Sequence, residues 1–153
     1  MTVSDVKKGF LDRMKTAFPE TEYTYYSMDV KEGFERPCFF TQIKPMDNKA
    51  ANYNSRRTQA TLYIDYLQET IDEADFLDVI QELQDTFGLA VRIGDRAVHV
   101  TDFDWDYIGT GKNAAEIAVG LEWGTRIKHD NKLPVMESAR FNTGMEEVSN
   151  GNA

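Results

Sequence analysis

Three aspartates, Asp102, Asp104 and Asp106, have the spacing that begins a calcium-binding loop of the EF-hand type. That loop also needs Gly at its sixth position and Glu at its twelfth, and here those positions hold Tyr107 and Asn113. The aspartates alternate with aromatic residues, and side chains alternate between the two faces of a strand. The pattern therefore favours a half-buried strand, with its rings inward and its carboxylates outward, over a calcium site.

The other motifs that could do chemistry are incomplete. Gly111-Lys112 lacks the first Gly and the Ser/Thr of a phosphate-binding loop, so it is better explained as a turn. Cys38 and His99 could form a nucleophile and base, but a cysteine in an aromatic strand usually behaves as a small buried hydrophobe. Glu20, with Asp29-Val30-Lys31, resembles the metal site of some nucleases only loosely. These motifs predict no catalytic, cofactor or metal site.

Composition further limits the kinds of partner and cell compartment that the chain can have. The 153 residues have 17 Lys and Arg against 26 Asp and Glu, a formal net charge of -9, which argues against nucleic acid or an anionic membrane as the main partner. No apolar run approaches the length of a membrane span. The single cysteine excludes an internal disulfide and is typical of a protein folded in a reducing cytoplasm.

The rest of the chain predicts the elements that would position these residues. Pro37 and Pro45 bracket a short strand with apolar residues on both faces, since proline suits a first position and Pro45 should end the ladder. Apolar residues at helical spacing predict helices over about Thr2–Ala17 and Thr70–Phe87. The remaining expected strands are 23–26, 57–67, 89–93, 96–108 and 114–127. This order predicts an α+β fold, a mixed or antiparallel β-sheet with two helices packed on one face.

The expected core lies on one stripe of each helix and one face of the long strand. Its members are Val6, Phe10, Met14, Phe18, Ala60, Leu62, Ile64, Tyr66, Phe76, Ile80, Leu83 and Phe87. Ser4 or Asp5 would cap the first helix and Thr70 the second. Gly9 lies off the stripe and should weaken its helix by about 0.5–1 kcal/mol relative to Ala.

Two segments lack an apolar pattern. Met46–Ser55 is polar and contains three Asn, which predicts a long loop that a partner orders. Residues 128–153 predict a polar, flexible C-terminal tail after a single domain over residues 1–127.

Several short motifs occur here in a combination that is more specific than any one of them. They are Ala17-Phe18-Pro19, Tyr23, Tyr26, Val30, Gly33-Phe34, Pro37-Cys38-Phe39-Phe40, Arg56-Arg57 and Ile64-Asp65-Tyr66, followed by the second helix and the hairpin at Ile93. Over roughly Val3–Ile127 the chain thereby resembles the phage tail terminator family of Gram-positive phages and prophages.

The resemblance implies a structural virion protein without catalytic residues or cofactors. Such a protein is expected to be made in the bacterial host cytoplasm and to cap the head-proximal end of the tail as a six-fold ring. It would end tube polymerisation and provide the surface for head joining. Its implied partners are its own copies, the tail tube protein and a head–tail connector protein, without a membrane or sequence-specific nucleic acid. The alternatives are a head-completion connector, a metal-dependent nuclease-like enzyme and an adaptor module unrelated to phage.

A basic pair in an acidic chain suggests where subunits would meet. Arg56 and Arg57 are expected to form ion pairs with the acidic face of the second helix of a neighbouring copy. The candidate interface residues are Arg56, Arg57, Asp78, Glu82 and Asp85, with Asn52 and Asn54 of the polar segment.

Overall fold

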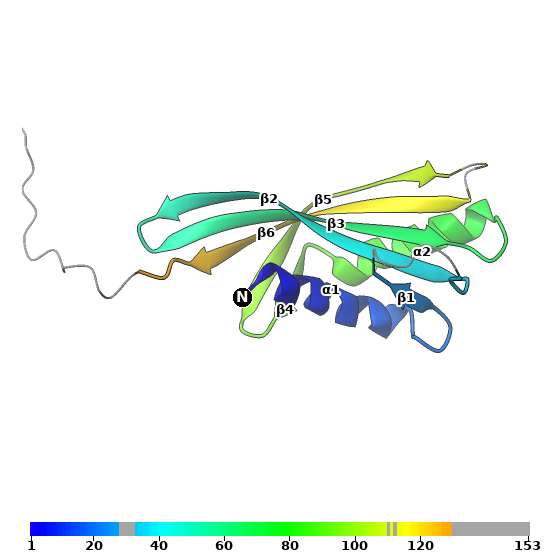
Figure 1. Cartoon of the computed structure of the whole chain (residues 1–153), viewed down its shortest axis with the longest axis horizontal. Coiled ribbons are helices and arrows are strands. Elements are labelled where there is room, and N and C mark those ends of the chain that lie inside the picture. The colour runs from blue at the N-terminus through cyan, green and yellow to red at the C-terminus, as the bar shows by residue number, and fades with distance from the viewer. Residues whose placement is uncertain (28–32, 110, 112, 130–153) are drawn as a thin grey trace, which may run out of the picture.

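A computed structural model describes residues 1–27, 33–109, 111 and 113–129, and Figure 1 shows the arrangement of its elements. Within these residues the chain forms two helices and six strands. Their bounds are α1 Val3–Ala17, β1 Thr24–Tyr26, β2 Cys38–Asn52, β3 Ser55–Leu67, α2 Glu73–Phe87, β4 Ala90–Ile93, β5 Arg96–Ile108 and β6 Ala114–Arg126. The predicted α+β class is confirmed, because the strands make one sheet of six and the helices join its core.

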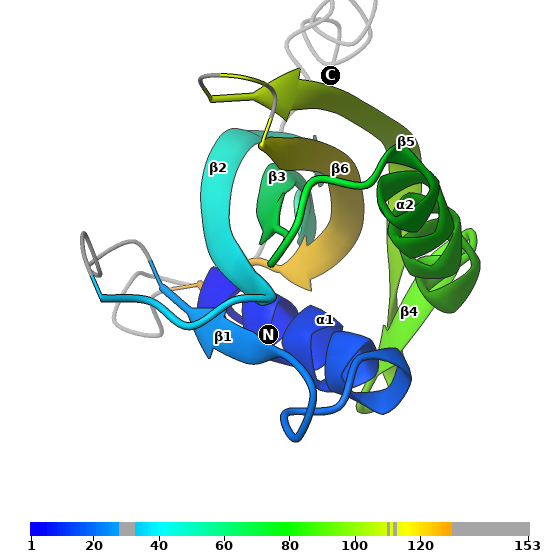
Figure 2. The ribbon, with the colours of Figure 1, turned by 90° about the vertical axis from the view of Figure 1, so that its right-hand side faces the viewer.

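The sheet is mixed and strongly curled. Its strand order is β1-β2-β3-β6-β5-β4, with β1 parallel to β2 and every other pair antiparallel. The curl brings α1 into contact with both β2 and β4, which lie near opposite edges of the sheet. Seen along the long axis, the strands wrap around the space beside α1 (Figure 2). The placement of both helices over a single face stays a prediction.

The core follows the predicted faces. All twelve expected core residues are buried, with exposed fractions of 6% or less. Phe39 of β2 lies at the centre of an aromatic cluster, with ring centroids 5.1–5.5 Å from those of Phe18, Tyr23, Tyr25 and Tyr66. The strand between the two prolines therefore does join the end of α1 to the middle of the sheet.

Neither helix is capped by a predicted residue: Ser4 and Asp5 lie inside the first turn of α1, whose cap is Thr2, and α2 is capped by Asp72. The side chain of Thr2 accepts a hydrogen bond from the N–H of Asp5, while the Asp5 carboxylate accepts one from the N–H of Thr2, which makes a reciprocal capping box. Asp72 caps α2 by accepting from the N–H of Ala74 at 3.1 Å, so the prediction of Thr70 was wrong. In each case the capping side chain belongs to the residue immediately before the first helical residue.

Gly9 has a packing role that periodicity alone did not reveal. A Cβ built at this position would lie 2.6 Å from two side-chain carbons of Ile93 in β4. The missing side chain lets α1 approach the sheet edge closely, and that approach offsets the loss of helix propensity.

The predicted loop over Met46–Ser55 is wrong, because these residues continue a long β-hairpin. β2 runs to Asn52, only Tyr53 and Asn54 lie between the strands, and the ladder to β3 extends from Cys38↔Leu67 to Asn52↔Ser55. Pro45 does not end the ladder. The chain tolerates its missing N–H because β1 pairs only as far as Phe40, so β2 is an edge strand at this point.

Of the predicted polar tail, only Lys128 and His129 lie within the described residues. The division into a domain over 1–127 and a tail therefore stays a prediction. Neither helix in the described part of the chain is long and apolar enough to cross a membrane.

Candidate subunit interface

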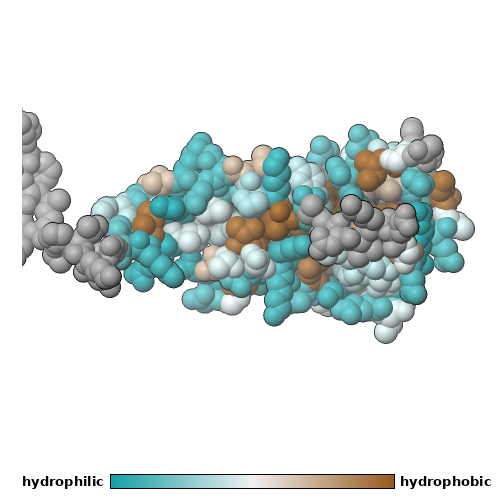
Figure 3. Space-filling view, in the orientation of Figure 1, coloured by the Kyte–Doolittle hydropathy of each residue, from teal (hydrophilic) through white to brown (hydrophobic). Residues whose placement is uncertain are grey.

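The distal half of the hairpin and the end of β6 form an extension that we call the arm, residues 44–57 and 124–128. It projects at one end of the long axis (Figure 1) and is largely hydrophilic on the face shown in Figure 3. The arm has six Lys or Arg and one Asp, although the whole chain has a formal net charge of -9. Its basic residues are Lys44, Lys49, Arg56, Arg57, Arg126 and Lys128.

Two of these cations were expected to act together, and the structure separates them. Arg57 Nε lies 3.4 Å from Glu122 Oε1 on β6, so it already has an acidic neighbour within its own chain. Arg56 points elsewhere and shares a hollow of about 250 Å³ with Arg126 and Lys128. Within the described residues neither Arg56 nor Arg126 has an ion pair. The better pair of free cations is therefore Arg56 and Arg126, which sequence adjacency could not reveal.

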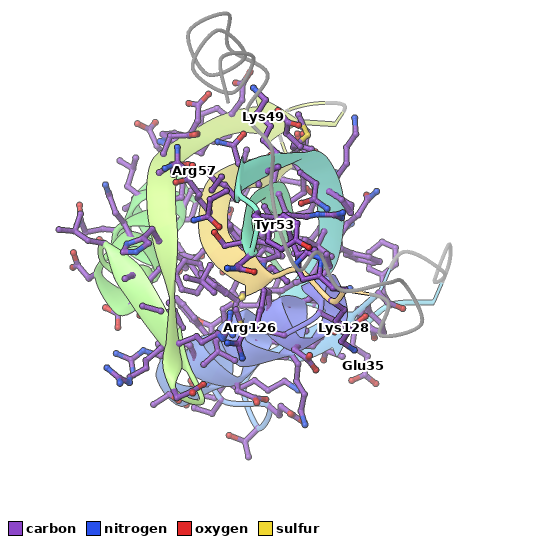
Figure 4. All side chains as sticks on the ribbon, turned by 90° about the vertical axis from the view of Figure 1, so that its left-hand side faces the viewer. Glu35, Lys49, Tyr53, Arg57, Arg126 and Lys128 are labelled. Carbon is purple, nitrogen blue, oxygen red and sulfur yellow. The ribbon has the colours of Figure 1, made fainter. Side chains whose placement is uncertain are left out.

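The end of the arm presents an aromatic side chain among these cations. Tyr53 is 76% exposed, and its ring stacks on that of His129 with centroids 4.2 Å apart. Seen end-on, Lys49, Arg57, Arg126 and Lys128 surround Tyr53 (Figure 4). A tyrosine held this way presents a large, rigid contact area of the kind that is enriched at protein interfaces.

Asn52 and Asn54, the two asparagine candidates, shape the tip of the arm. The Asn52 side chain accepts from the N–H of Asn54 at 2.8 Å, and the Asn54 carbonyl accepts from the N–H of Ile127 at 2.9 Å. The second contact ties the hairpin to the end of β6. Both asparagines are exposed, so their role as interface residues stays a prediction.

The acidic candidates lie on a second surface, which we call the acidic helix face. Asp78, Glu82 and Asp85 are exposed on α2, which lies over the half of the molecule away from the arm (Figure 1). From Thr58 to Val91 the sequence has eight Asp or Glu and no Lys or Arg. The fold therefore separates the basic and acidic candidates within one chain, and any ion pair between them must join two copies.

Buried hydrogen bonds fix α2 in place. Gln68, at the end of β3, is only 3% exposed; its side chain donates to the Asp72 carbonyl and accepts from the Asp72 N–H, both at 2.8 Å. Asp75, one turn into the helix, accepts from the Tyr66 hydroxyl at 2.7 Å and also from Gln68. The start of α2 is thus tied to the end of β3.

A hollow of about 610 Å³ lies on the sheet face opposite the core. Phe40, Lys44 and Tyr63 line it together with two carboxyl groups, Asp65 and Glu116, which sit directly opposite each other on β3 and β6. Burial and, to a smaller extent, the adjacent Glu116 together raise the pKa of Asp65 to about 6. One oxygen of Asp65, Oδ1, is buried without a hydrogen-bond partner among the described residues.

Replacing Asp65 by asparagine should stabilise the protein at neutral pH. The folded-state pKa of about 6 exceeds the unfolded value of about 3.9, so the folded state holds the proton more tightly. Stability is then lost as pH rises from about 4 to about 6. The substitution should raise the unfolding free energy at pH 7.5 by about 1 kcal/mol, after allowance for partial exposure, and flatten its change between pH 7.5 and 4.5. Urea titrations at both pH values measure this, and an unchanged pH profile would contradict it.

The motifs weighed for enzyme chemistry remain separate in space. Asp102, Asp104 and Asp106 are exposed on β5, and their aromatic neighbours face the core, as predicted. The part of the chain that the structure describes contains no group of three or more His, Cys, Asp or Glu that could hold a metal ion. The nuclease-like segment at residues 29–31 and Lys112 lie outside the described residues.

Cys38 and His99 are not brought together. His99 is exposed on β5 opposite Glu122, whereas Cys38 is fully buried on β2, three strands away in the pairing order β2-β3-β6-β5. Burial raises the pKa of the Cys38 thiol to about 11, the opposite of what a nucleophile needs. The prediction of a small buried hydrophobe is confirmed.

Native protein should therefore react with iodoacetamide at Cys38 at least 100-fold more slowly than protein unfolded in urea, because only the exposed thiolate attacks. Intact-mass measurements over time give both rates, and unfolded protein is the matched control. Similar rates in the two states would show that the thiol is accessible in the fold.

Comparison with protein-family models matches residues 5–117 to the family described as phage tail terminator protein. The chain belongs to the phage tail terminator protein family. Its role is therefore that of a structural component of the phage tail, and the family resemblance predicted from sequence is confirmed. No curated protein matches this terminator.

Solved structures share the fold of this terminator at low sequence identity. One of them aligns over 86% of this chain and 99% of its own length, with a TM-score of 0.51 and 15% identity. At that identity the likeness concerns the fold alone. It supports the curled sheet with two helices as a recurring arrangement.

The sequence interpretation missed four arm residues: Lys49, Tyr53, Arg126 and Lys128. The available signal was the charge distribution, since basic residues gather on both sides of a long stretch that contains none. That signal was hidden because Met46–Ser55 was assigned to a loop, with no expected contact to the end of the strand predicted over 114–127.

Proposed function

We propose that this terminator caps the head-proximal end of the tail tube as a ring of six copies. In that position it ends polymerisation of the tube protein and presents the surface that a head–tail connector protein joins. Assembly takes place in the cytoplasm of the bacterial host. The observation that carries the proposal is the family match over residues 5–117, which includes both helices and most of the sheet.

The two separated surfaces support assembly from identical copies. A ring needs each subunit to offer two different contact surfaces, one to each neighbour. The arm and the acidic helix face are two such surfaces on one chain, and both are exposed. The proposed interface residues are Arg56, Arg57, Asn52 and Asn54 on the arm with Asp78, Glu82 and Asp85 on α2.

Tube polymerisation in the presence of the terminator tests the proposal. Purified tube protein should form tubes of unlimited length alone, and short tubes with a ring at one end when the terminator is added. Negative-stain images give the length distribution and the position of the ring. Tubes that keep growing, with no ring at either end, would overturn the capping function and favour the connector alternative.

A further inference from the structure

We infer that neighbouring copies contact each other through two different surfaces, with the arm of one copy docked on the acidic helix face of the next. The inference rests on the proposed function, because it specifies the contact by which the ring forms. The partner is a second copy of this chain, and its chemistry is set by two complementary surfaces.

Charge complementarity is the first argument. The arm has six cations and one carboxylate, whereas the segment from Thr58 to Val91 has eight carboxylates and no cation. Such segregation is costly within one molecule, since like charges lie close together on each surface. A contact between the two surfaces relieves the repulsion on both and steers the copies into one orientation.

The exposed apolar residues give a second, independent argument. Five large hydrophobic side chains are exposed among the described residues, and all of them lie on or beside these two surfaces. Met46 and Tyr53 belong to the arm; Ile71, Leu77 and Leu89 belong to α2 or flank it. Large apolar groups surrounded by charges are the usual composition of a protein–protein contact, with the apolar groups in its centre.

The ion pairs and hydrogen bonds within one chain indicate which charged residues remain available for a contact between copies. Arg57 forms an ion pair with Glu122 and Lys49 with Asp47, which leaves Arg56 and Arg126 as the arginines of the arm without an ion pair among the described residues. Arg56 lies opposite Thr125 and Arg126 opposite Ser55, so their side chains start from opposite faces of the β3–β6 ladder, and both line the hollow at its end. On the acidic helix face, Asp85 accepts from the Gln81 side chain, which leaves Asp78 and Glu82 four residues apart on one stripe. We assign the contact to Arg56 and Arg126 of one copy against Asp78 and Glu82 of the next.

A charge-swap experiment tests the assignment. One variant reverses the arm (Arg56→Glu with Arg126→Glu), and a second reverses the helix (Asp78→Lys with Glu82→Lys). Each alone should associate at least tenfold more weakly than wild type in sedimentation velocity at low ionic strength. An equimolar mixture of the two should associate as wild type does, and so should a chain with all four changes.

The matched control reverses two cations outside both surfaces, Lys8→Glu with Arg92→Glu, which alters the net charge as much as the arm variant does. This control should assemble normally. Far-ultraviolet circular dichroism and melting temperatures check that every variant folds. Wild-type association should also weaken steeply as salt is raised, because exposed ion pairs are screened.

Three results would overturn the inference. They are normal assembly of either reversed variant, failure of the mixture and of the fourfold variant to recover, and wild-type protein that stays monomeric at every concentration. None of these results decides the capping function, which the tube-length measurement tests separately. A wild-type ring that caps tubes but ignores the charge swap would leave the proposed function intact and refute only this contact.

Discussion

Replacing Phe39 by alanine should lower the free energy of unfolding by about 3–5 kcal/mol, the usual cost of removing a buried aromatic side chain. The residue is fully buried, and its ring contacts four other aromatic rings. Those rings come from the end of α1, from β1 and its preceding turn, and from β3. The cavity would therefore loosen three elements at once. Urea denaturation followed by circular dichroism measures the loss.

Phe40→Ala is the matched control, because it removes the same side chain from the opposite face of the same strand. Phe40 is only partly buried and stacks on Tyr26 with centroids 5.2 Å apart. Its loss should cost less than half as much, since less apolar area returns to water. Equal losses for the two variants would show that Phe39 is not the centre of the core.

The second large effect concerns the start of α2. Gln68→Ala should lower the free energy of unfolding by about 2–3 kcal/mol, because it removes the three hydrogen bonds of a side chain that is only 3% exposed, one of them to the Asp75 carboxylate. Amide exchange in the first turn of α2 should accelerate more than exchange in β3. The acidic helix face would then lose its fixed position.

Gln81→Ala provides the comparison for that effect. Gln81 is exposed, and its side chain donates only to Asp85 within the same helix. Its removal should change the unfolding free energy by no more than about 0.5 kcal/mol. If the two glutamines proved equally important, the anchoring of α2 by Gln68 would be refuted.

Periodicity predicted most of this fold because the buried face of each element has a strong pattern. The stripe of α2 and the alternate residues of β3 meet in one core, as their spacing indicates. The arm escaped prediction for a physical reason. Both faces of β2 beyond Lys44 are exposed, so no apolar alternation marks it as a strand. Its strand structure depends on backbone hydrogen bonds to β3, and side-chain types give little information about such pairing.

The candidate interface was predictable only in part. Charge type singled out Arg56 and the acids of α2 as candidates, but the partner of Arg57 comes from β6, more than sixty residues later. The pairing of β3 with β6 decides which cations of the arm lack an ion pair within the described residues. That pairing depends on the whole fold and has no local signature in the sequence.

The outer strands β1 and β4 are short, so parts of the neighbouring strands β2 and β5 have no paired strand on one side. β4 pairs only with Arg96–His99, so the remainder of β5 has no strand on its other side within the described residues. Two amides of that segment, the N–H groups of Trp105 and Tyr107, donate to the side chains of Asp104 and Asp106. An exposed strand margin normally invites another strand to add to it and starts aggregation. Asp104 and Asp106, two of the aspartates that imitate a calcium loop, thus engage two of the backbone donors that an added strand would need.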